Sequence, residues 1–370
     1  MPIKIDPWSE SIPHDYARMI EEFGIESFES MIDRIPDPNH LMRRKIVFGH
    51  RDFGRILEAI QNGNDYIVMT GLMPSGRMHL GHKLVVDQLI WHLDHGAKIY
   101  LCVADLESHM TRGLSLKEAR DLAIEEYLVN FQALKLDLNK CYLYFQSHSN
   151  AVKQLAFTLG GKVNFSELKA IYGFAGDSNA SQIFYPMIDV ADILHPQLDD
   201  FEGPGPSVVP VGIDQDPHIR LARDVAGRFQ REFGFVPPSS TYNRLVPGLM
   251  GEKMSSSRPK GVIFLTDTIE EIKSKVLNAV TGGGHTVKEQ RKEGGNPDEC
   301  SVYSLYVFHL IPDDEKLLEL RESCESGELI CGDCKDKAIK LLRGFLEEHR
   351  DAREKARDEI KEILESELRK

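Results

Sequence analysis

The sequence has little of what a membrane-bound or secreted protein needs. No apolar run approaches the roughly 18–20 residues of a membrane span. Its first residues lack the basic and apolar pattern of a signal peptide. Six cysteines among 370 residues are too few for a disulfide scaffold and suggest a reducing compartment. We therefore expect a cytoplasmic protein with no membrane partner.

Net positive charge is also lacking, because 58 acidic residues outnumber 45 Lys and Arg and the formal net charge is −13. Taken alone, this argues against nucleic-acid binding, but a local basic patch matters more than the sum. An acidic chain with a basic groove can still bind a large folded RNA. Hydrophobic residues make up 41% of the chain, which excludes global disorder. The length is sufficient for two domains, or for one large domain with an appendage.

What the sequence does contain is one short motif, Pro74–His82 (PSGRMHLGH). It follows an apolar run at 66–70 that predicts a buried strand, and it precedes apolar residues at helical spacing up to Gly96. The end of a parallel strand and the start of a helix form a site for ligands and anions. His79 and His82 could donate imidazole N–H groups to phosphate oxygens there. The missing side chain of Gly81 would let a base or sugar approach the backbone.

Two later stretches carry further polar groups. Gly251–Ser257 (GEKMSSS) is a Gly/Ser loop with one lysine. By itself it is typical of a flexible linker, but after the histidine motif Lys253 could close over the β- and γ-phosphates of a nucleotide. Asp214 and Gln215 follow an expected strand at 207–211. Asp214 could accept hydrogen bonds from a ribose, or it could simply cap the next helix.

Alternation of strands and helices predicts the fold class. Strands are expected at 66–70, 97–104, 142–145 and 207–211, with helices at 115–134, 150–160, 164–172, 179–194 and 216–233. This order favours an α/β fold with a Rossmann-like, doubly wound parallel sheet. We expect an N-terminal extension at 1–60 that adds a packing layer, a catalytic domain at 61–266 and an all-helical domain at 267–370. A short strand at 263–265 and a helix capped from Asp267 should join the last two.

His-Leu-Gly-His followed by Lys-Met-Ser-Ser-Ser resembles the signature pair of class I aminoacyl-tRNA synthetases. Asp214–Asp224 (DQDPHIRLARD), Asp6-Pro7-Trp8 and Thr281-Gly282-Gly283 are similar to the tryptophanyl-tRNA synthetases of archaea and eukaryotes. The similarity covers almost the whole chain. It implies a helical anticodon-binding domain, a homodimer, and L-tryptophan, ATP with Mg²⁺, and tRNA(Trp) as substrates and partners.

In such an enzyme a substrate carboxylate attacks the α-phosphate of ATP in line. Rate then comes from positioning and from donors aimed at developing charge, with no protein nucleophile. The resemblance assigns catalysis to His79, His82 and Lys253. It assigns ATP binding to Pro74, Gly76, His79, Gly81, His82, Gly212, Asp214, Lys253, Met254, Ser255 and Ser256.

The amino-acid pocket needs one acceptor for an indole N–H among apolar walls. Carboxylates at Asp189 and Asp192 on the otherwise apolar stretch 179–194 are anomalous. Asp192 matches the acceptor of bacterial tryptophan enzymes and, equally, an aspartate of the tyrosine enzymes; a salt bridge to a neighbouring helix is the simpler alternative. The eukaryotic relatives differ at Met69, Cys102 and Asp189, where they have tyrosine, glutamine and glutamine. The expected tryptophan-binding residues are therefore Asp192 or Asp189, with Gln215 and Glu107 at the polar end and Met69 in the wall.

Four of the six cysteines fall near the C-terminus, at Cys300, Cys324, Cys331 and Cys334. A Cys-x₂-Cys turn suits thiolate ligation of zinc or iron–sulfur. The spacing also resembles that of some bacterial tryptophan enzymes, in which it holds a [4Fe–4S] cluster. The sequence leaves two alternatives: the four cysteines bind a cluster or Zn²⁺, or they are free or disulfide-bonded thiols.

Three other functions compete with that of a tryptophan enzyme. A tyrosine enzyme shares the motifs, but the Asp214–Asp224 run speaks against it. A catalytically dead RNA-binding paralogue would have no reason to keep both histidines and Lys253. A simple nucleotidyltransferase shares the histidine turn but lacks the lysine loop and the helical C-terminus.

Overall fold

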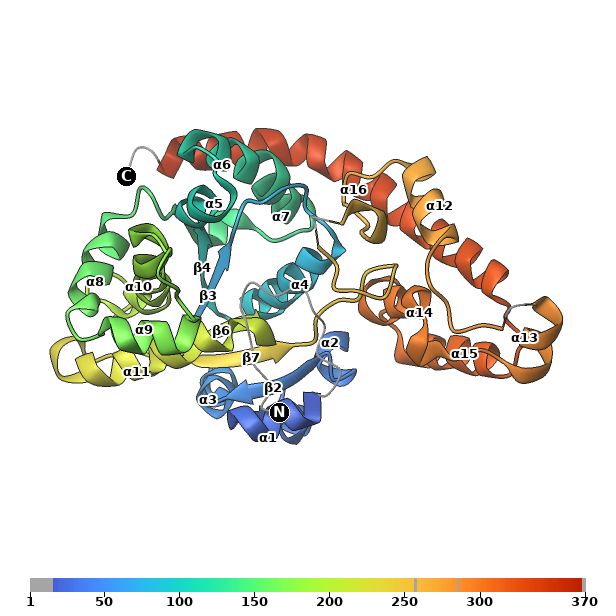
Figure 1. Cartoon of the computed structure of the whole chain (residues 1–370), viewed down its shortest axis with the longest axis horizontal. Coiled ribbons are helices and arrows are strands. Elements are labelled where there is room, and N and C mark those ends of the chain that lie inside the picture. The colour runs from blue at the N-terminus through green and yellow to red at the C-terminus, as the bar shows by residue number, and fades with distance from the viewer. Residues whose placement is uncertain (1–15, 256–257, 285, 368–370) are drawn as a thin grey trace.

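The structure, a computed structural model, describes residues 16–255, 258–284 and 286–367. Figure 1 shows a sheet-containing part that holds the N-terminal two thirds of the chain and a helical part that extends from it. The last helix, α16 (Cys331–Glu367), runs across both. Among the residues that the structure describes, no helix is long and apolar enough to cross a membrane.

A seven-stranded sheet, counted over the described residues, forms the centre. Its order is β1-β2-β7-β6-β3-β4-β5, and neighbours from β7 to β5 are parallel, whereas β2 pairs antiparallel with both β1 and β7. The strands are β1 (Glu26–Ser27), β2 (Val47–Arg51), β3 (Ile67–Leu72), β4 (Lys98–Val103), β5 (Cys141–Phe145), β6 (Ser207–Gly212) and β7 (Ser239–Asn243).

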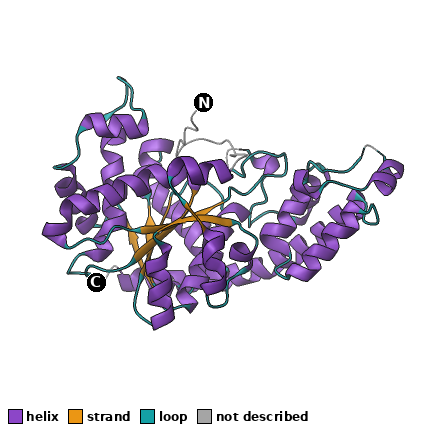
Figure 2. Ribbon diagram, turned by 90° about the horizontal axis from the view of Figure 1, so that it is seen from below, coloured by secondary structure: helices purple, strands orange, loops and turns teal. Residues whose placement is uncertain are grey.

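Both faces of the parallel sheet are buried, as Figure 2 shows from below. Val68 and Leu101 belong to a core shared with one layer of helices, and Met69 and Cys102 to a second core on the opposite face. This alternation follows from the two-residue period of a strand. The first layer holds α3 (Phe53–Asn62), α4 (Leu80–Asp94), α6 (Leu116–Ala123) and α7 (Val129–Ala133); the second holds α8 (Asn150–Gly160), α10 (Ala180–Leu194) and α11 (Asp216–Phe233). The expected doubly wound α/β class is therefore confirmed.

The remaining described helices are shorter or belong to the helical part. They are α1 (Tyr16–Phe23), α2 (His40–Arg43), α5 (Asp105–Arg112), α9 (Phe165–Tyr172), α12 (Ile269–Leu277), α13 (Val287–Glu293), α14 (Ser301–Leu305) and α15 (Asp314–Glu325). Of two π-helical turns, η2 (Ile124–Leu128) lies between α6 and α7 in one continuous helix, and η8 (Tyr306–Leu310) ends the helix that begins with α14.

Three local expectations need correction. Residues 26–51 are more than a packing layer, because β1 and β2 continue the sheet through β7. The stretch 263–265 is not a strand; only Phe264 forms an isolated bridge, with His79, because a turn follows at once, in which the Asp267 carboxylate accepts the Phe264 N–H at 3.0 Å. The cap of α12 is Thr268 rather than Asp267, in a capping box with Glu271. The capping box of Ser115 with Glu118 is confirmed.

Candidate active site

A cavity of about 960 Å³ opens at the carboxyl ends of β3, β4 and β6. It brings together most of the residues singled out above: Met69, His79, Gly81, His82, Cys102, Glu107, Asp189, Asp192, Gly212, Asp214, Gln215, Lys253, Met254 and Ser255. Pro74 and Gly76 lie in the loop after β3 but do not line the cavity, whereas Ser75 between them does. Ser256 and the Asp6-Pro7-Trp8 turn lie outside the described residues.

The two histidines cap the start of α4, because the ring of each accepts a backbone N–H there. The Gly81 N–H donates to Nδ1 of His79 at 3.1 Å, and the His79 N–H donates to Nδ1 of His82 at 3.2 Å. A side chain at position 81 would place its Cβ 2.9 Å from the His79 ring. Glycine is therefore required for His79 to fold over the helix start. This is a second reason for glycine at position 81, besides the approach of a base or sugar that the sequence suggested.

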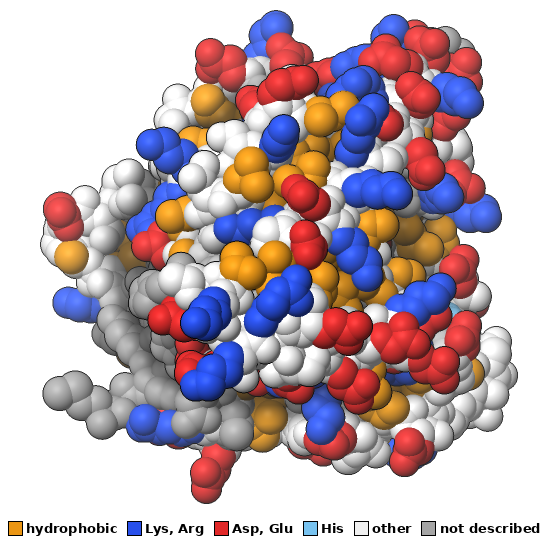
Figure 3. All heavy atoms as spheres, turned by 90° about the vertical axis from the view of Figure 1, so that its right-hand side faces the viewer, with side chains coloured by type: hydrophobic (Ala, Val, Ile, Leu, Met, Phe, Trp, Pro, Cys, Tyr) orange, Lys and Arg blue, Asp and Glu red, His pale blue; other side chains and the backbone are white. Residues whose placement is uncertain are grey.

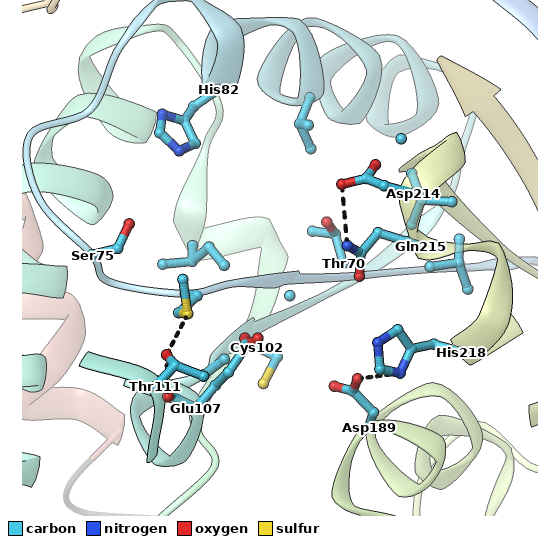
Figure 4. Close-up of a pocket in the computed structure, with 18 of the residues that line it drawn as sticks. Thr70, Ser75, His82, Cys102, Glu107, Thr111, Asp189, Asp214, Gln215 and His218 are labelled. Carbon is cyan, nitrogen blue, oxygen red and sulfur yellow. Dashed lines mark hydrogen bonds and ion pairs between the residues drawn. The ribbon is translucent and has the colours of Figure 1, made fainter. Parts of the chain in front are cut away.

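This capping also fixes where each imidazole carries its proton. Burial lowers the pKa of His82 to about 4 and that of His79 well below its ordinary value, so both rings are neutral at pH 7. Because each Nδ1 accepts a backbone N–H, the proton of each ring lies on Nε2. Figure 4 shows the His82 ring projecting from α4 toward the cavity. The site thus presents neutral donors rather than two imidazolium charges.

Lys253 reaches the same cavity from the loop between β7 and α12. Its ammonium forms an ion pair with Asp214, with Nζ 3.0 Å from Oδ2. Asp214 is not a helix cap: it lies in a 3-10 turn at 213–215, and the residue before α11 is Gln215. The lysine and the aspartate therefore partly neutralise each other's charge in this cavity.

Asp192 lies deeper, in an apolar part of the cavity. Its two carboxylate oxygens accept the Tyr144 hydroxyl at 2.7 Å and the Gln146 amide at 2.5 Å. The Cys102 thiol lines the same cavity. Burial raises the pKa of Asp192 to about 7. This carboxyl is buried and hydrogen-bonded and has no salt-bridge partner among the described residues, which speaks against the simpler alternative for it.

Asp189 lies nearer the opening and is paired with a residue that the sequence analysis did not single out. Nδ1 of His218 lies 2.7 Å from Oδ2 of Asp189, and the two face each other in Figure 4. Burial by itself would lower the pKa of His218, but Asp189 beside it raises the pKa overall. Glu107 stands close by, and burial together with Asp189 raises its pKa to about 8. These groups form an acidic end suited to an ammonium group.

Tyr144 and Gln146 were also missed, although a signal was present. Tyr142, Tyr144 and Gln146 alternate at strand spacing, and Gln146 directly follows β5 at the edge where ligands bind. His218 carries no such signal, because its role depends on α10 packing against α11.

Comparison with known proteins identifies the family to which the chain belongs. The family model of class I tRNA synthetases (W and Y) matches residues 61–347. The chain belongs to the class I tRNA synthetases. Tryptophan–tRNA ligases from Methanocaldococcus jannaschii and Methanopyrus kandleri are each 47% identical, covering 98% and 97% of this chain and 98% and 96% of the relatives. The crystal structure of tryptophanyl-tRNA synthetase from Aeropyrum pernix K1 superposes with a TM-score of 0.90 at 44% identity, over 94% of this chain and 96% of that one.

Residues 263–267 pack against the loop that carries the histidine motif, and the family's use of ATP gives a reason for this contact. Class I tRNA synthetases use ATP, and the loop with His79 must hold its donors steady. Residues 263–265 support it: Leu80 N donates to Ile263 O at 3.1 Å and Leu265 N to Met78 O at 3.0 Å. Arg77 stacks over Phe264 and pairs with the buried Asp267 at 3.2 Å. The 263–267 run therefore fixes the loop from behind.

Proposed function

We propose that the protein activates L-tryptophan with ATP, forming tryptophanyl-adenylate and pyrophosphate, and then transfers tryptophan to the 3′ end of tRNA(Trp). The convergence of two neutral imidazole donors, one lysine and an acidic pocket in a single cavity carries this proposal. The relatives named tryptophan–tRNA ligase align over nearly the full length of both chains, which favours tryptophan over tyrosine.

In the first step the tryptophan carboxylate attacks the α-phosphate and pyrophosphate leaves. Nε2–H of His79 and of His82 would donate to the phosphate oxygens on which negative charge develops. Lys253 would leave Asp214 and follow the β- and γ-phosphates, and Asp214 would then accept from the ribose. Gly212, Met254 and Ser255 line the same end of the cavity. Mg²⁺ would enter with ATP, whose phosphates are its usual ligands.

Tryptophan would lie with its indole toward Asp192 and its ammonium toward Asp189 and Glu107. Asp192 is surrounded by Met69, Cys102 and Ile193, so it offers an acceptor among apolar walls. A carboxylate has about four lone-pair sites, so an indole N–H can join Tyr144 and Gln146 there. Asp189 supplies negative charge for the ammonium. Glu107, whose pKa burial and Asp189 raise to about 8, is mostly neutral at pH 7 and would ionise as the ammonium binds, and Gln215 lines the cavity beside them.

ATP–pyrophosphate exchange with each amino acid tests the function. Exchange that depends on tryptophan and not on tyrosine is expected. Tyrosine-dependent exchange would favour the tyrosine enzyme, and no exchange with either would favour a dead RNA-binding paralogue.

Asp192→Ala is expected to weaken tryptophan binding about 5- to 150-fold, because an unpaired indole donor costs about 1–3 kcal/mol. Asp192→Asn should weaken it less, since the amide still accepts but the charge-assisted bond is lost. Equilibrium binding of tryptophan measures this, with ATP affinity as the internal control. Unchanged tryptophan affinity in Asp192→Ala would shift the assignment to Asp189.

The four C-terminal cysteines line one small cavity in the helical part. Within the described residues the structure has no His, Cys, Asp or Glu group of three or more arranged to hold a metal ion, and the six cysteines are free thiols. Two features nevertheless suit a bound group. A Cβ at Gly283 or Gly295 would lie 2.5 Å and 2.8 Å from the sulfurs of Cys331 and Cys324, so glycine keeps space beside each. The Tyr303 N–H points at the Cys300 sulfur at 3.4 Å.

We therefore propose that Cys300, Cys324, Cys331 and Cys334 hold a [4Fe–4S] cluster or Zn²⁺ that shapes the tRNA-binding part. Anaerobically purified protein should absorb near 400 nm and contain iron and sulfide, or contain stoichiometric zinc. Cys331→Ser should abolish the signal, whereas Cys141→Ser, outside this cavity, should keep it. Colourless, zinc-free protein with four alkylatable thiols would contradict the site.

The proposed partners are tRNA(Trp) and a second copy of the chain. Figure 3 shows the end of the helical part, where Lys and Arg lie among Asp and Glu around exposed hydrophobic groups. For the dimer, Phe157, Phe165 and Phe184 project from α8, α9 and α10 with exposed fractions of 80%, 50% and 40%. The Phe184 ring lies against Gly160 of α8, the helix that carries Phe157. Apolar clusters of this kind are typical of interfaces, and the molar mass in solution measures the dimer.

A further inference from the structure

The π turn η2 lies between the histidine motif and the C-terminal helix. Its backbone departs from α-helical spacing: the Val129 N–H donates to Ile124 O, five residues earlier. Such turns are rare, lie mostly inside α-helices and are frequently found at functional sites. Here the turn presents three consecutive side chains, Glu125, Glu126 and Tyr127, to two different neighbours.

Glu126 and Tyr127 contact the loop that carries the histidines. Oε2 of Glu126 accepts the Met78 N–H at 3.4 Å, and the Tyr127 hydroxyl accepts the Ser75 N–H at 3.4 Å. The Tyr127 ring is fully buried and packs edge-on against His82, with centroids 5.4 Å apart. Tyr127 also lines the cavity, whereas Glu126 does not, and both residues bond to the backbone of the loop. They fix the loop and the ring that we assign to ATP.

Glu125 faces the other way, toward α16. Arg353 Nη2 donates to its carboxylate at 2.9 Å and to its backbone carbonyl at 3.1 Å, and Arg357 Nη2 donates to the carboxylate at 2.6 Å. Arg357, and then Arg353, lower the pKa of Glu125. The Arg353 side chain is 7% exposed, whereas that of Glu125 is 47% exposed, so the arginine of this pair is buried and its carboxylate is partly solvated.

A second connection runs through buried Asn130. Nε2 of His349 on α16 donates to Oδ1 of Asn130 at 2.8 Å, and Nδ2 of Asn130 donates to the Glu126 carbonyl at 2.5 Å. Asn130 is fully buried. Helix α16 therefore reaches both Glu125 and Glu126, although it comes from the helical part of the chain; Figure 1 shows it lying along α6 and α7.

We propose that α16 is a positioning element for the nucleotide site: through Arg353, Arg357 and His349 it holds η2 so that Glu126 and Tyr127 fix the Pro74–His82 loop. The inference rests on the proposed function, because it assigns that loop to ATP. It makes Arg353, Arg357 and Tyr127 positioning residues. Their loss should weaken ATP binding and adenylate formation and leave tryptophan binding unchanged, since the Asp192 pocket lies on the other face of the sheet.

The test compares an Arg353→Gln/Arg357→Gln double variant with Arg343→Gln. Arg343 is on the same helix and pairs with Glu347 at 2.9 Å, but this exposed pair does not touch η2. The double variant should raise the ATP concentration for half-maximal adenylate formation about 3- to 10-fold, the scale of one or two lost hydrogen bonds. Arg343→Gln should match the wild type, and tryptophan affinity should be the same in all three.

Tyr127→Phe keeps the ring against His82 and removes only the hydroxyl, so it tests the same path without the helix. A similar rise for ATP, with an unchanged melting temperature, is expected. Wild-type ATP dependence in Tyr127→Phe, or equal losses for ATP and tryptophan in the double variant, would overturn the inference. Absence of tryptophan-dependent exchange in the wild type would instead contradict the proposed function.

Discussion

Lys253→Ala is expected to slow tryptophanyl-adenylate formation about 10²–10³-fold, the scale of removing one donor that acts on developing charge. In the structure Lys253 pairs with Asp214, whereas Asp192 is held by Tyr144 and Gln146. Tryptophan binding should therefore change little, and the loss should appear in the rate of the chemical step. Rapid-quench measurement of adenylate formation in a single turnover tests this.

Lys260→Ala is the matched control, because Lys260 is an exposed lysine farther along the same loop and does not line the cavity. Its rate should equal that of the wild type. Asp214→Asn breaks the ion pair but leaves the lysine in place, so it distinguishes loss of the ion pair from loss of the lysine itself. A wild-type rate of adenylate formation in Lys253→Ala would remove the lysine from the reaction.

The parallel part of the fold was predictable because burial on both faces makes a strand apolar along its whole length. Residues 67–72, 98–103 and 141–145 carry that signal, and all three are strands. β7 carries none: Ser239, Ser240, Thr241 and Asn243 are polar yet at most 2% exposed. β2 includes Gly49 and His50, which also weaken its pattern. β7 exists because it pairs with β6, and β2 because it pairs with β7, and no local pattern encodes that pairing.

The residues of the site also differ in how far the sequence alone reveals them. His79, His82 and Gly81 are neighbours in sequence, so their motif shows the site directly. The residues that support them are distant: Tyr127 is 52 residues from Ser75, and Arg353 is 228 residues from Glu125. The sequence predicts one continuous helix over 115–134, because apolar spacing does not reveal the extra residue of a π turn. The partners of Asp192 on β5 could have been inferred from strand alternation, whereas the pairing of Asp189 with His218 required the packing of two helices.

His82→Ala is expected to reduce adenylate formation about 10²–10³-fold, because it removes an oxyanion donor. It also removes the acceptor of the His79 N–H, so part of the loss comes from a less ordered helix start. His82→Asn offers a shorter polar side chain at the same position and should recover part of the rate. The sign of the pH effect follows from the ring's state: since burial lowers the pKa of His82 to about 4, the neutral Nε2–H donor is present throughout pH 6–8.

The rate of adenylate formation should therefore show no loss from His82 between pH 8 and pH 6, and protonation should matter only as the pH falls toward 4. Nitrogen NMR of the imidazoles should report the Nε2–H form of both rings at pH 7. A rate that rises as the pH falls through 6.5 in the wild type, and is flat in His82→Ala, would mean that the imidazolium acts instead. That outcome would contradict the backbone-to-Nδ1 hydrogen bonds on which the assignment of both donors rests, because an imidazolium carries a proton on each nitrogen and cannot accept them.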